Sequence, residues 1–130
     1  MKKIIIVFTL VIAVFSVFSS CNDDVIDDKG LLITNRSECY ISFFDILGSE
    51  NVTTLISGTT IDTVALTVNA TAKFGTNLKS VKPYCSVVTD AIVEPAMGKW
   101  VDFTQPLQYT IISGNRKVRK TYTITITLQQ

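Results

Sequence analysis

The stretch Tyr122-Thr123-Ile124-Thr125-Ile126-Thr127-Leu128 decides the fold, because large apolar residues and threonines alternate along it without a break. Successive side chains of a β-strand point to opposite faces, so the alternation predicts a strand with one apolar face and one threonine face. A strand of this kind packs its apolar face on a core and turns its threonines toward water. The stretch therefore predicts a β protein whose last strand is half buried.

The residues before this strand predict its hairpin partner. Leu107, Tyr109 and Ile111 share one face of the stretch 107–112, and Ser113-Gly114-Asn115-Arg116 is a turn signal, so residues 107–128 form a predicted β-hairpin. Four basic side chains crowd the turn, either as solvated protection of the hairpin end or as an anion contact: Arg116, Lys117, Arg119 and Lys120.

Further short strands are predicted upstream. The stretch 61–70 alternates, with Val64, Leu66 and Val68 inward, and the stretch 39–44 places Cys39, Ile41 and Phe43 on one side. Pro83 marks the start or the edge of a strand at 81–88. Shorter candidates are 52–56 and 91–93. Six or seven strands at about 8–12-residue spacing predict an all-β antiparallel β-sandwich.

The N-terminus has the layout of a secretory signal peptide. Lys2 and Lys3 precede an apolar run over 4–18, which is shorter than the ~20 residues of a membrane-spanning helix. An uncleaved membrane anchor is the alternative. Removal of residues 1–20 takes both lysines with it and lowers the formal charge from +1 to about −1.

The end of the apolar run is more specific. Phe18-Ser19-Ser20-Cys21 resembles the bacterial lipobox, in which the cysteine is lipidated and becomes the first residue, although Phe18 replaces the usual leucine. The acidic residues that follow resemble the export signal of Bacteroidetes surface lipoproteins. We therefore expect a signal peptide at 1–20, lipidated Cys21 and a flexible acidic tether at 21–37, and a domain at 38–130. The lipid anchors the protein in the outer membrane, where it is exposed at the surface.

The domain resembles the small immunoglobulin-like domains of Bacteroidetes surface lipoproteins. Such domains occur beside glycan-binding modules and as spacers or adhesion modules. The resemblance covers about residues 40–128 and implies an immunoglobulin-like β-sandwich, because its motifs are fold motifs without catalytic content. The matching stretches are Gly75-Thr76-Asn77-Leu78-Lys79-Ser80-Val81-Lys82-Pro83, Val93-Glu94-Pro95, Asp102-Phe103-Thr104-Gln105-Pro106-Leu107-Gln108-Tyr109-Thr110-Ile111 and Lys120-Thr121-Tyr122-Thr123-Ile124-Thr125-Ile126.

The composition excludes several function classes. The chain has no histidine, so it has no imidazole base, no Ser-His or Cys-His nucleophile and no histidine metal ligand. The near-zero net charge gives no general attraction to nucleic acid. A sandwich of about 100 residues leaves little chain to build a cleft around two carboxylates. We therefore predict a protein without catalytic residues, cofactor or metal.

Two cysteines remain after lipidation of Cys21, and two arrangements are open for them. Cys39 and Cys85 both lie on inward faces by strand parity. A cysteine pair in an exported domain suggests a disulfide. Two separate buried thiols that act as small apolar side chains are the other arrangement.

Trp100 and Thr63 are the remaining site candidates. If Val101 and Phe103 point inward, Trp100 points outward, where it contacts a sugar ring or a protein partner, or else covers a loop. Tyr40 and Tyr84 are interpreted as packing residues. Asp62-Thr63-Val64 resembles the acceptor for O-glycosylation of exported Bacteroidetes proteins, and Thr63 lies on an outward face.

These features together predict a monomeric, non-catalytic surface lipoprotein with a binding or adhesion surface for a glycan or a partner surface protein. The alternative is a structural spacer or a subunit of an outer-membrane or pilus-like assembly. A pilus subunit would exchange a strand between protomers, and the strong final strand argues for a closed domain instead.

Overall fold

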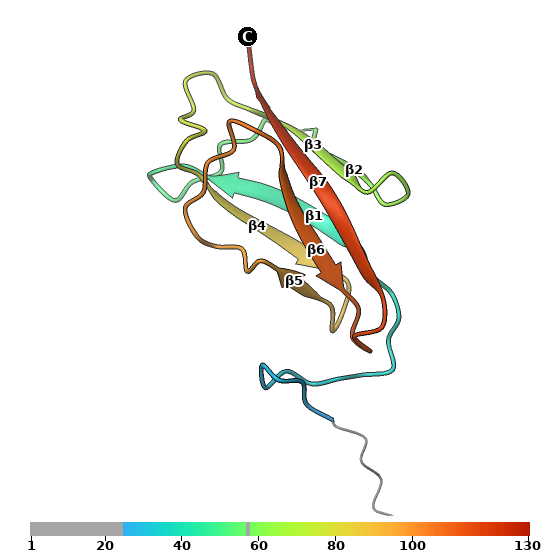
Figure 1. Ribbon diagram of the computed structural model, residues 1–130. Helices are drawn as coiled ribbons and strands as arrows, with labels where there is room; N and C mark the ends of the chain where they lie inside the picture. The colour runs from blue at the N-terminus through green and yellow to red at the C-terminus, as the bar shows by residue number, and fades with distance from the viewer. Residues whose placement is uncertain (1–24, 57) are drawn as a thin grey trace, which may run out of the picture.

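The protein is a β-sandwich of two facing sheets, as the sequence predicted (Figure 1). The computed structural model describes residues 25–56 and 58–130, so the predicted signal peptide and Cys21 lie outside the described residues. The described residues contain no helix long and apolar enough to cross a membrane. The seven strands are β1 (Ile41–Leu47), β2 (Thr60–Asp62), β3 (Thr67–Ala72), β4 (Lys82–Val87), β5 (Ile92–Glu94), β6 (Leu107–Ile112) and β7 (Arg119–Leu128).

One sheet contains two strands in the order β1-β4, and the other contains five in the order β2-β3-β7-β6-β5. The predicted hairpin is β6–β7, which pairs antiparallel from Leu107 opposite Ile124 to Ile112 opposite Arg119. The pairing of β7 with β3 is parallel, which departs from the antiparallel arrangement that the sequence predicted. Parallel neighbours need a long crossover connection, and residues 73–118 supply it.

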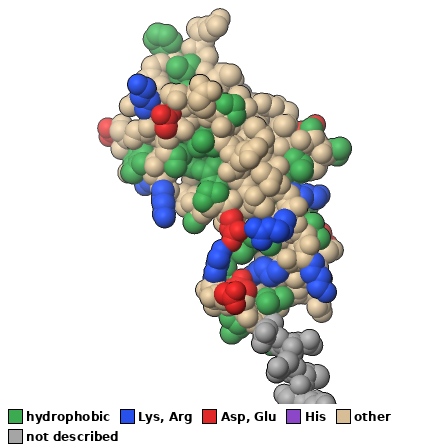
Figure 2. All heavy atoms as spheres, viewed as in Figure 1, with side chains coloured by type: hydrophobic (Ala, Val, Ile, Leu, Met, Phe, Trp, Pro, Cys, Tyr) green, Lys and Arg blue, Asp and Glu red, His purple; other side chains and the backbone are tan. Residues whose placement is uncertain are grey.

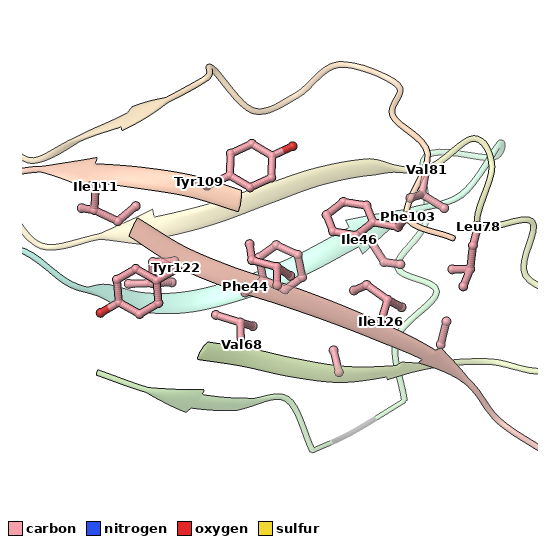
Figure 3. Packing of buried hydrophobic residues seen from close by; sticks show 14 of the residues in the cluster. Phe44, Ile46, Val68, Leu78, Val81, Phe103, Tyr109, Ile111, Tyr122 and Ile126 are labelled. Carbon is pink, nitrogen blue, oxygen red and sulfur yellow. The ribbon is translucent and has the colours of Figure 1, made fainter. Parts of the chain in front are cut away.

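The inward face of β7 forms the centre of the core (Figure 3). Tyr122 and Ile124 are completely buried, and Phe44 of β1 packs near-perpendicular to Phe103, with ring centroids 6.4 Å apart. Burial of each large apolar side chain contributes about 1.5–3 kcal/mol, so this layer between the sheets supplies most of the stabilisation. Leu128, which the alternation placed on the inward face, is exposed where β7 passes the end of the core.

The stretch 61–70 is a tight hairpin instead of the single strand that the sequence predicted. The Oδ1 atom of Asp62 accepts hydrogen bonds from the backbone N–H groups of Val64 and Ala65, both at 2.8 Å. This local Asp turn ends β2, and Leu66 adopts a positive φ of 58° before β3 begins. As a result Val64 is 92% exposed, and only Val68 of the predicted inward set is fully buried.

A β-bulge changes which residues face the core in the strand predicted at 39–44. The register of β1 against β4 shifts between Ile41 and Phe43, because a bulged strand places one extra residue against its partner. Phe43 therefore points outward, contrary to the prediction, and Phe44 takes the buried position. The candidate at 52–56 forms only isolated bridges, from Thr53 to β1 and from Leu55 to β3.

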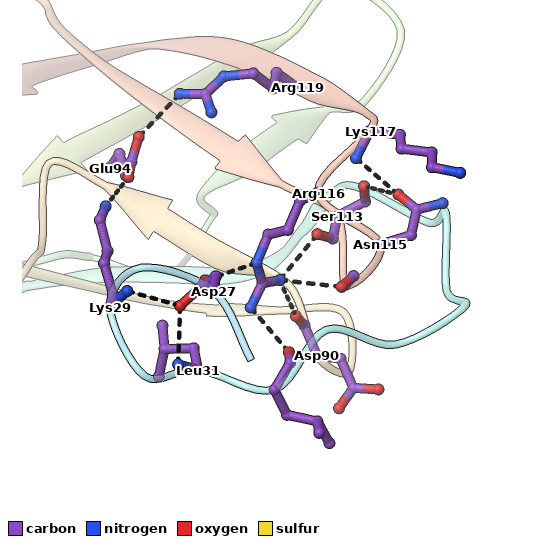
Figure 4. A network of polar contacts seen from close by, with 12 residues as sticks. Asp27, Lys29, Leu31, Asp90, Glu94, Ser113, Asn115, Arg116, Lys117 and Arg119 are labelled. Carbon is purple, nitrogen blue, oxygen red and sulfur yellow. Dashed lines mark hydrogen bonds and ion pairs between the residues drawn. The ribbon is translucent and has the colours of Figure 1, made fainter. Parts of the chain in front are cut away.

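The N-terminal segment, residues 25–37, is held against the turn of the β6–β7 hairpin (Figure 4). The Nε atom of Arg116 donates to Oδ2 of Asp27 at 2.9 Å, and an Nη atom of Arg116 donates to the carbonyl of Leu32 at 3.0 Å. Two backbone hydrogen bonds support the contact. The N–H of Thr34 donates to the carbonyl of Gly114, and the N–H of Asn115 donates to the carbonyl of Arg36. The described part of the predicted flexible tether is thus packed on the domain.

Asp27 organises the fold of this segment. Its Oδ1 atom accepts from the backbone N–H groups of Leu31 at 2.8 Å and Lys29 at 3.0 Å. The bond from Leu31, together with the nearby Arg116 guanidinium, lowers the pKa of Asp27. Lysines, arginines and carboxylates gather at this end of the molecule in Figure 2, and several are paired there, such as Arg119 with Glu94.

Candidate functional site

The outward face of the β1–β4 sheet and the adjoining loop between β5 and β6 carry exposed rings. Phe43 of β1 is 47% exposed and Tyr84 of β4 is 38% exposed, and their ring centroids lie 5.9 Å apart. Lys82 lies two residues before Tyr84, on the same face of β4. Its Nζ atom lies 4.7 Å from the ring centroid of Trp100, which is 46% exposed. Phe43, Tyr84, Lys82 and Trp100 are called the aromatic row below.

Local backbone features bring the aromatic row together. The bulge in β1 turns Phe43 outward, whereas the regular alternation of β4 turns Tyr84 outward and Pro83 inward. Val81 and Val101 exchange two backbone hydrogen bonds, at 2.8 and 3.1 Å. This antiparallel bridge places Trp100 beside the start of β4 and therefore beside Lys82.

A buried carboxylate fixes the orientation of Tyr84. Asp45 is 8% exposed, and its Oδ2 atom accepts a hydrogen bond from the Tyr84 hydroxyl at 2.9 Å. Its Oδ1 atom accepts from the Thr53 hydroxyl at 2.6 Å and from the backbone N–H of Ile46 at 2.7 Å. The bond to Asp45 raises the pKa of Tyr84, because it holds the phenolic proton in place. The ring is thereby held in one position before any ligand arrives.

Lys82 is held in a similar way. Its Nζ atom donates to Oδ1 of Asn51 at 3.0 Å while it lies over the Trp100 ring. Asn51 sits in the turn after β1 with a positive φ of 55°, a conformation that asparagine tolerates better than most residues. The Lys82 side chain is half-buried, and its charged group lies over the Trp100 ring.

A shallow groove of about 380 Å³ begins beside the aromatic row. It lies along the edge of β1 that β4 does not cover, where the chain leaves Thr53 for the other sheet. Phe43 and Asp45 of β1 are among the residues that line it. The other lining residues are Ser42, Phe44, Leu55, Ile56, Gly58, Thr59 and Ile61, together with Thr53.

This arrangement is suited to holding a ligand. Large exposed rings on a rigid sheet bury apolar area at little cost in conformational entropy, and exposed aromatic clusters of this kind commonly mark interaction sites. Both oxygens of Asp45 already accept hydrogen bonds from neighbouring groups. No group of three or more cysteines and carboxylates suited to a metal ion occurs in residues 25–56 or 58–130.

Of the residues that the sequence singled out, Trp100 lies in the aromatic row. It is exposed and Phe103 is buried, as the alternation predicted, and its ligand contact stays a prediction. The sequence reasoning missed Phe43, Tyr84 and Lys82. Lys82 and Tyr84 alternate with the buried Pro83 along β4, and this alternation indicates that both side chains face outward. The sequence reasoning nevertheless interpreted Tyr84 as a packing residue.

Cys39 and Cys85 are free thiols in the structure, the second of the two arrangements that the sequence left open. Cys85 lies opposite Phe44, five residues along the chain from Cys39. At about 3.3 Å per residue this separates the two far beyond the ~7 Å between Cα atoms that a disulfide spans. The Cys39 thiol donates to the carbonyl of Ile111 at 3.0 Å, and burial raises the pKa of Cys85 to about 11.

Thr63 is exposed at the tip of the β2–β3 hairpin, where it directly follows Asp62, the last residue of β2. Its O-glycosylation stays a prediction. Predicted lipidation at Cys21 lies outside the described residues.

Comparison with known proteins identifies a family for most of the chain. Residues 46–126 match the family described as SGBP, N-terminal. The matched range runs from the C-terminal end of β1 into β7. It therefore includes Tyr84, Lys82 and Trp100. No curated protein matches the chain in a sequence comparison.

Two solved structures share the fold. One is a candidate glycoside hydrolase from Bacteroides thetaiotaomicron, with a TM-score of 0.58 and 22% identity over 72% of this chain. The other is a DUF4623 family protein from Bacteroides eggerthii, with a TM-score of 0.55 and 14% identity over 72% of this chain. The match spans 26% of the first protein and 22% of the second, so the sandwich corresponds to about a quarter of each. At these identities the likeness is one of fold.

Proposed function

The chain belongs to the SGBP, N-terminal family, which is a family of Bacteroidetes surface proteins associated with glycan binding, and on that basis we propose that it is a non-catalytic lipoprotein that holds a glycan on the aromatic row. In this proposal lipidated Cys21 anchors the mature chain in the outer membrane. An immunoglobulin-like sandwich then presents the aromatic row outside the cell.

The observation that carries the proposal is the group of exposed rings formed by Phe43 and Tyr84 on the β1–β4 sheet and by Trp100 beside the start of β4. The apolar C–H faces of sugar rings pack against aromatic faces, and removal of both surfaces from water is favourable. Tyr84 is fixed by Asp45, so binding costs little side-chain ordering. These features support a site that binds by contact alone and performs no chemistry on its ligand.

Affinity electrophoresis of the full-length protein in detergent, through gels that contain different polysaccharides, tests the proposal. We expect retardation in at least one gel and about tenfold weaker binding in each of Trp100→Ala and Tyr84→Ala, because central aromatic contacts carry most of the energy of an interface. Phe74→Ala is the matched control, since Phe74 is 83% exposed in the loop after β3 and outside the aromatic row. Equal retardation of Trp100→Ala and the unaltered protein would exclude the aromatic row as the glycan-binding site.

Membrane attachment is tested separately at Cys21. We expect Cys21→Ala to lose incorporation of a palmitate analogue and to leave the membrane fraction, whereas Ser20→Ala keeps both. A Cys21→Ala protein that stays in the membrane fraction would point to the uncleaved N-terminal anchor instead.

A structural spacer is the second candidate function, and one observation favours it. The N-terminal segment lies at one end of the sandwich and the C-terminus at the opposite end (Figure 1). A spacer, or a module for a partner surface protein, would show no retardation in any glycan gel but would be recovered with a partner after cross-linking on cells. We expect a monomer in size-exclusion chromatography, whereas a pilus-like assembly would give a ladder of oligomers.

We retain O-glycosylation of Thr63 as part of this proposal, because the exposed hairpin tip leaves its hydroxyl accessible. Intact-mass analysis of protein from its native cells should show a sugar mass that disappears in Thr63→Ala and remains in Thr59→Ala. An unmodified native protein would exclude this modification.

A further inference from the structure

Lys82 is the one charged member of the aromatic row, and its charge is not neutralised by a carboxylate. The ion pairs formed by described residues join Lys29 and Arg119 to Glu94, Arg36 to Asp90 and Arg116 to Asp27, and none of them includes Lys82. The contacts of Lys82 are the neutral amide of Asn51 and the Trp100 ring.

Other exposed lysines also lack a carboxylate partner, so position distinguishes Lys82. Its ammonium group is fixed at two points, by a 3.0 Å hydrogen bond and by the face of an indole. A fixed ammonium group loses less conformational entropy on binding than a mobile surface lysine does. It lies over the Trp100 ring, and Lys82 shares the outward face of β4 with Tyr84, so a ligand that contacts both rings comes close to the ammonium group.

The carboxylate of Asp45 does not serve as the counter-ion for Lys82. Asp45 lies under Tyr84, and its two oxygens accept from Tyr84, Thr53 and Ile46. Among the described residues the ammonium group therefore has no anionic partner, and a ligand with an acidic group can supply one.

From this geometry we propose that the aromatic row selects an acidic glycan, whose carboxylate or sulfate group pairs with Lys82 while its sugar rings lie on Tyr84 and Trp100. This inference rests on the proposed function and names the ligand class of the same site. A charge-assisted hydrogen bond to the acidic group supplies the selectivity, and the rings supply apolar contact that any sugar shares.

Isothermal titration of the full-length protein in detergent tests the proposal with two matched ligand pairs. The first pair is dextran sulfate and dextran, and the second is polygalacturonate and its fully methyl-esterified form. We expect the charged member of at least one pair to bind about tenfold more tightly, with affinity that falls as salt is raised, because exposed charge interactions are screened. The pair that shows the preference identifies sulfate or carboxylate as the recognised group.

Three variants connect the preference to Lys82. Lys82→Met keeps an unbranched side chain over Trp100 and removes the charge, so it should abolish the preference while the far-UV circular dichroism and the midpoint of urea unfolding stay native. Lys82→Arg should keep the preference, and Lys117→Met, at the turn of the β6–β7 hairpin, should leave it unchanged.

The outcomes separate the two proposals. Equal binding of charged and neutral ligands, or an unchanged preference in Lys82→Met, overturns the acidic ligand and leaves the glycan-binding function standing if Trp100→Ala still weakens binding. Absence of binding to all four polysaccharides, together with no retardation in any glycan gel, overturns both.

Discussion

At the scale of single residues, the chemistry of the two thiols follows from where the sheets place them. Cys39 is buried against Ile111, and Cys85 lies on the inner face of β4, too far along the strand to reach it. Neither thiol has a histidine to activate it, because the chain contains none. Both are therefore expected to act as small apolar residues.

A thiol titration checks this arrangement. In denaturant without reductant, the full-length protein should react with a thiol reagent at one equivalent each for Cys39 and Cys85, because no bridge is present to block them. In native buffer the reaction should be far slower. Unreactive thiols that appear only after reduction would show that the two cysteines are bridged.

The raised pKa of Cys85 gives a pH dependence of stability. Burial disfavours the thiolate in the folded state, so its pKa rises from 9.0 to about 11 and the folded protein holds its proton more tightly than the unfolded chain. The free energy of unfolding should therefore be at its full value below about pH 9 and fall between pH 9 and pH 11. Urea unfolding at several pH values should show a shallower fall in Cys85→Ala, measured against Ser86→Ala, an exposed neighbour on β4, as the matched variant.

At the scale of elements, β7 is the central strand of the five-stranded sheet, where it pairs with a neighbour on each side and is buried on one face. Tyr122, Ile124 and Ile126 are buried, whereas Thr121 and Thr127 are exposed. The outer threonines also pair across strands, as between Thr110 and Thr121 at 2.9 Å. The alternation in the sequence thus corresponds directly to the two faces of the strand.

Paired substitutions on β7 measure this difference. Ile124→Ala should lower the free energy of unfolding by about 2–5 kcal/mol, because it removes buried methyl groups from the layer between the sheets. Thr125→Ala, one residue further along the same strand, should cost less than about 1 kcal/mol. Similar losses for both variants in urea unfolding would contradict the assignment of faces.

The strands that the sequence predicted well are those whose structure depends on burial of one face. β6, β7 and the turn between them follow from a regular alternation and a local turn signal. The hairpin at Asp62 and the bulge before Phe43 do not follow from periodicity, since one depends on a side-chain oxygen that caps two backbone N–H groups and the other on register against β4. The aromatic row was only partly predictable for the same reason, because the bulge decides that Phe43 and not Phe44 faces outward.

The contact between the N-terminal segment and the β6–β7 turn depends on Arg116, which reaches Asp27, Leu32 and Gly114. Arg116→Met should release the segment and speed amide hydrogen exchange at Leu31 by about tenfold or more, because charge-assisted hydrogen bonds are lost. Lys117→Met removes a neighbouring charge without these contacts and should leave exchange unchanged. Unchanged exchange in Arg116→Met would show that the backbone bonds suffice.

At the scale of the whole molecule, β6 and β7 run roughly along the line between the two ends of the described chain (Figure 1). The N-terminal segment lies beside the hairpin turn, and β7 leads from that turn to the C-terminus at the far end (Figure 1). Within the proposed function, Cys21 precedes Val25 by four residues, which span at most about 14 Å when extended. The hairpin turn is then the part of the domain nearest the membrane, and the aromatic row runs along its flank.

The pairing of β7 with two neighbours has a mechanical consequence. A pull between the N-terminal segment and the C-terminus acts roughly along β7, so it drags this strand lengthwise past β3 and β6. The ladders join six residue pairs on each side, from Thr67–Thr123 to Ala72–Leu128 and from Leu107–Ile124 to Ile112–Arg119. Lengthwise load is shared by all of these bonds at once, whereas a load across the strands would open them one after another. The sandwich is thus built to bear tension along its axis.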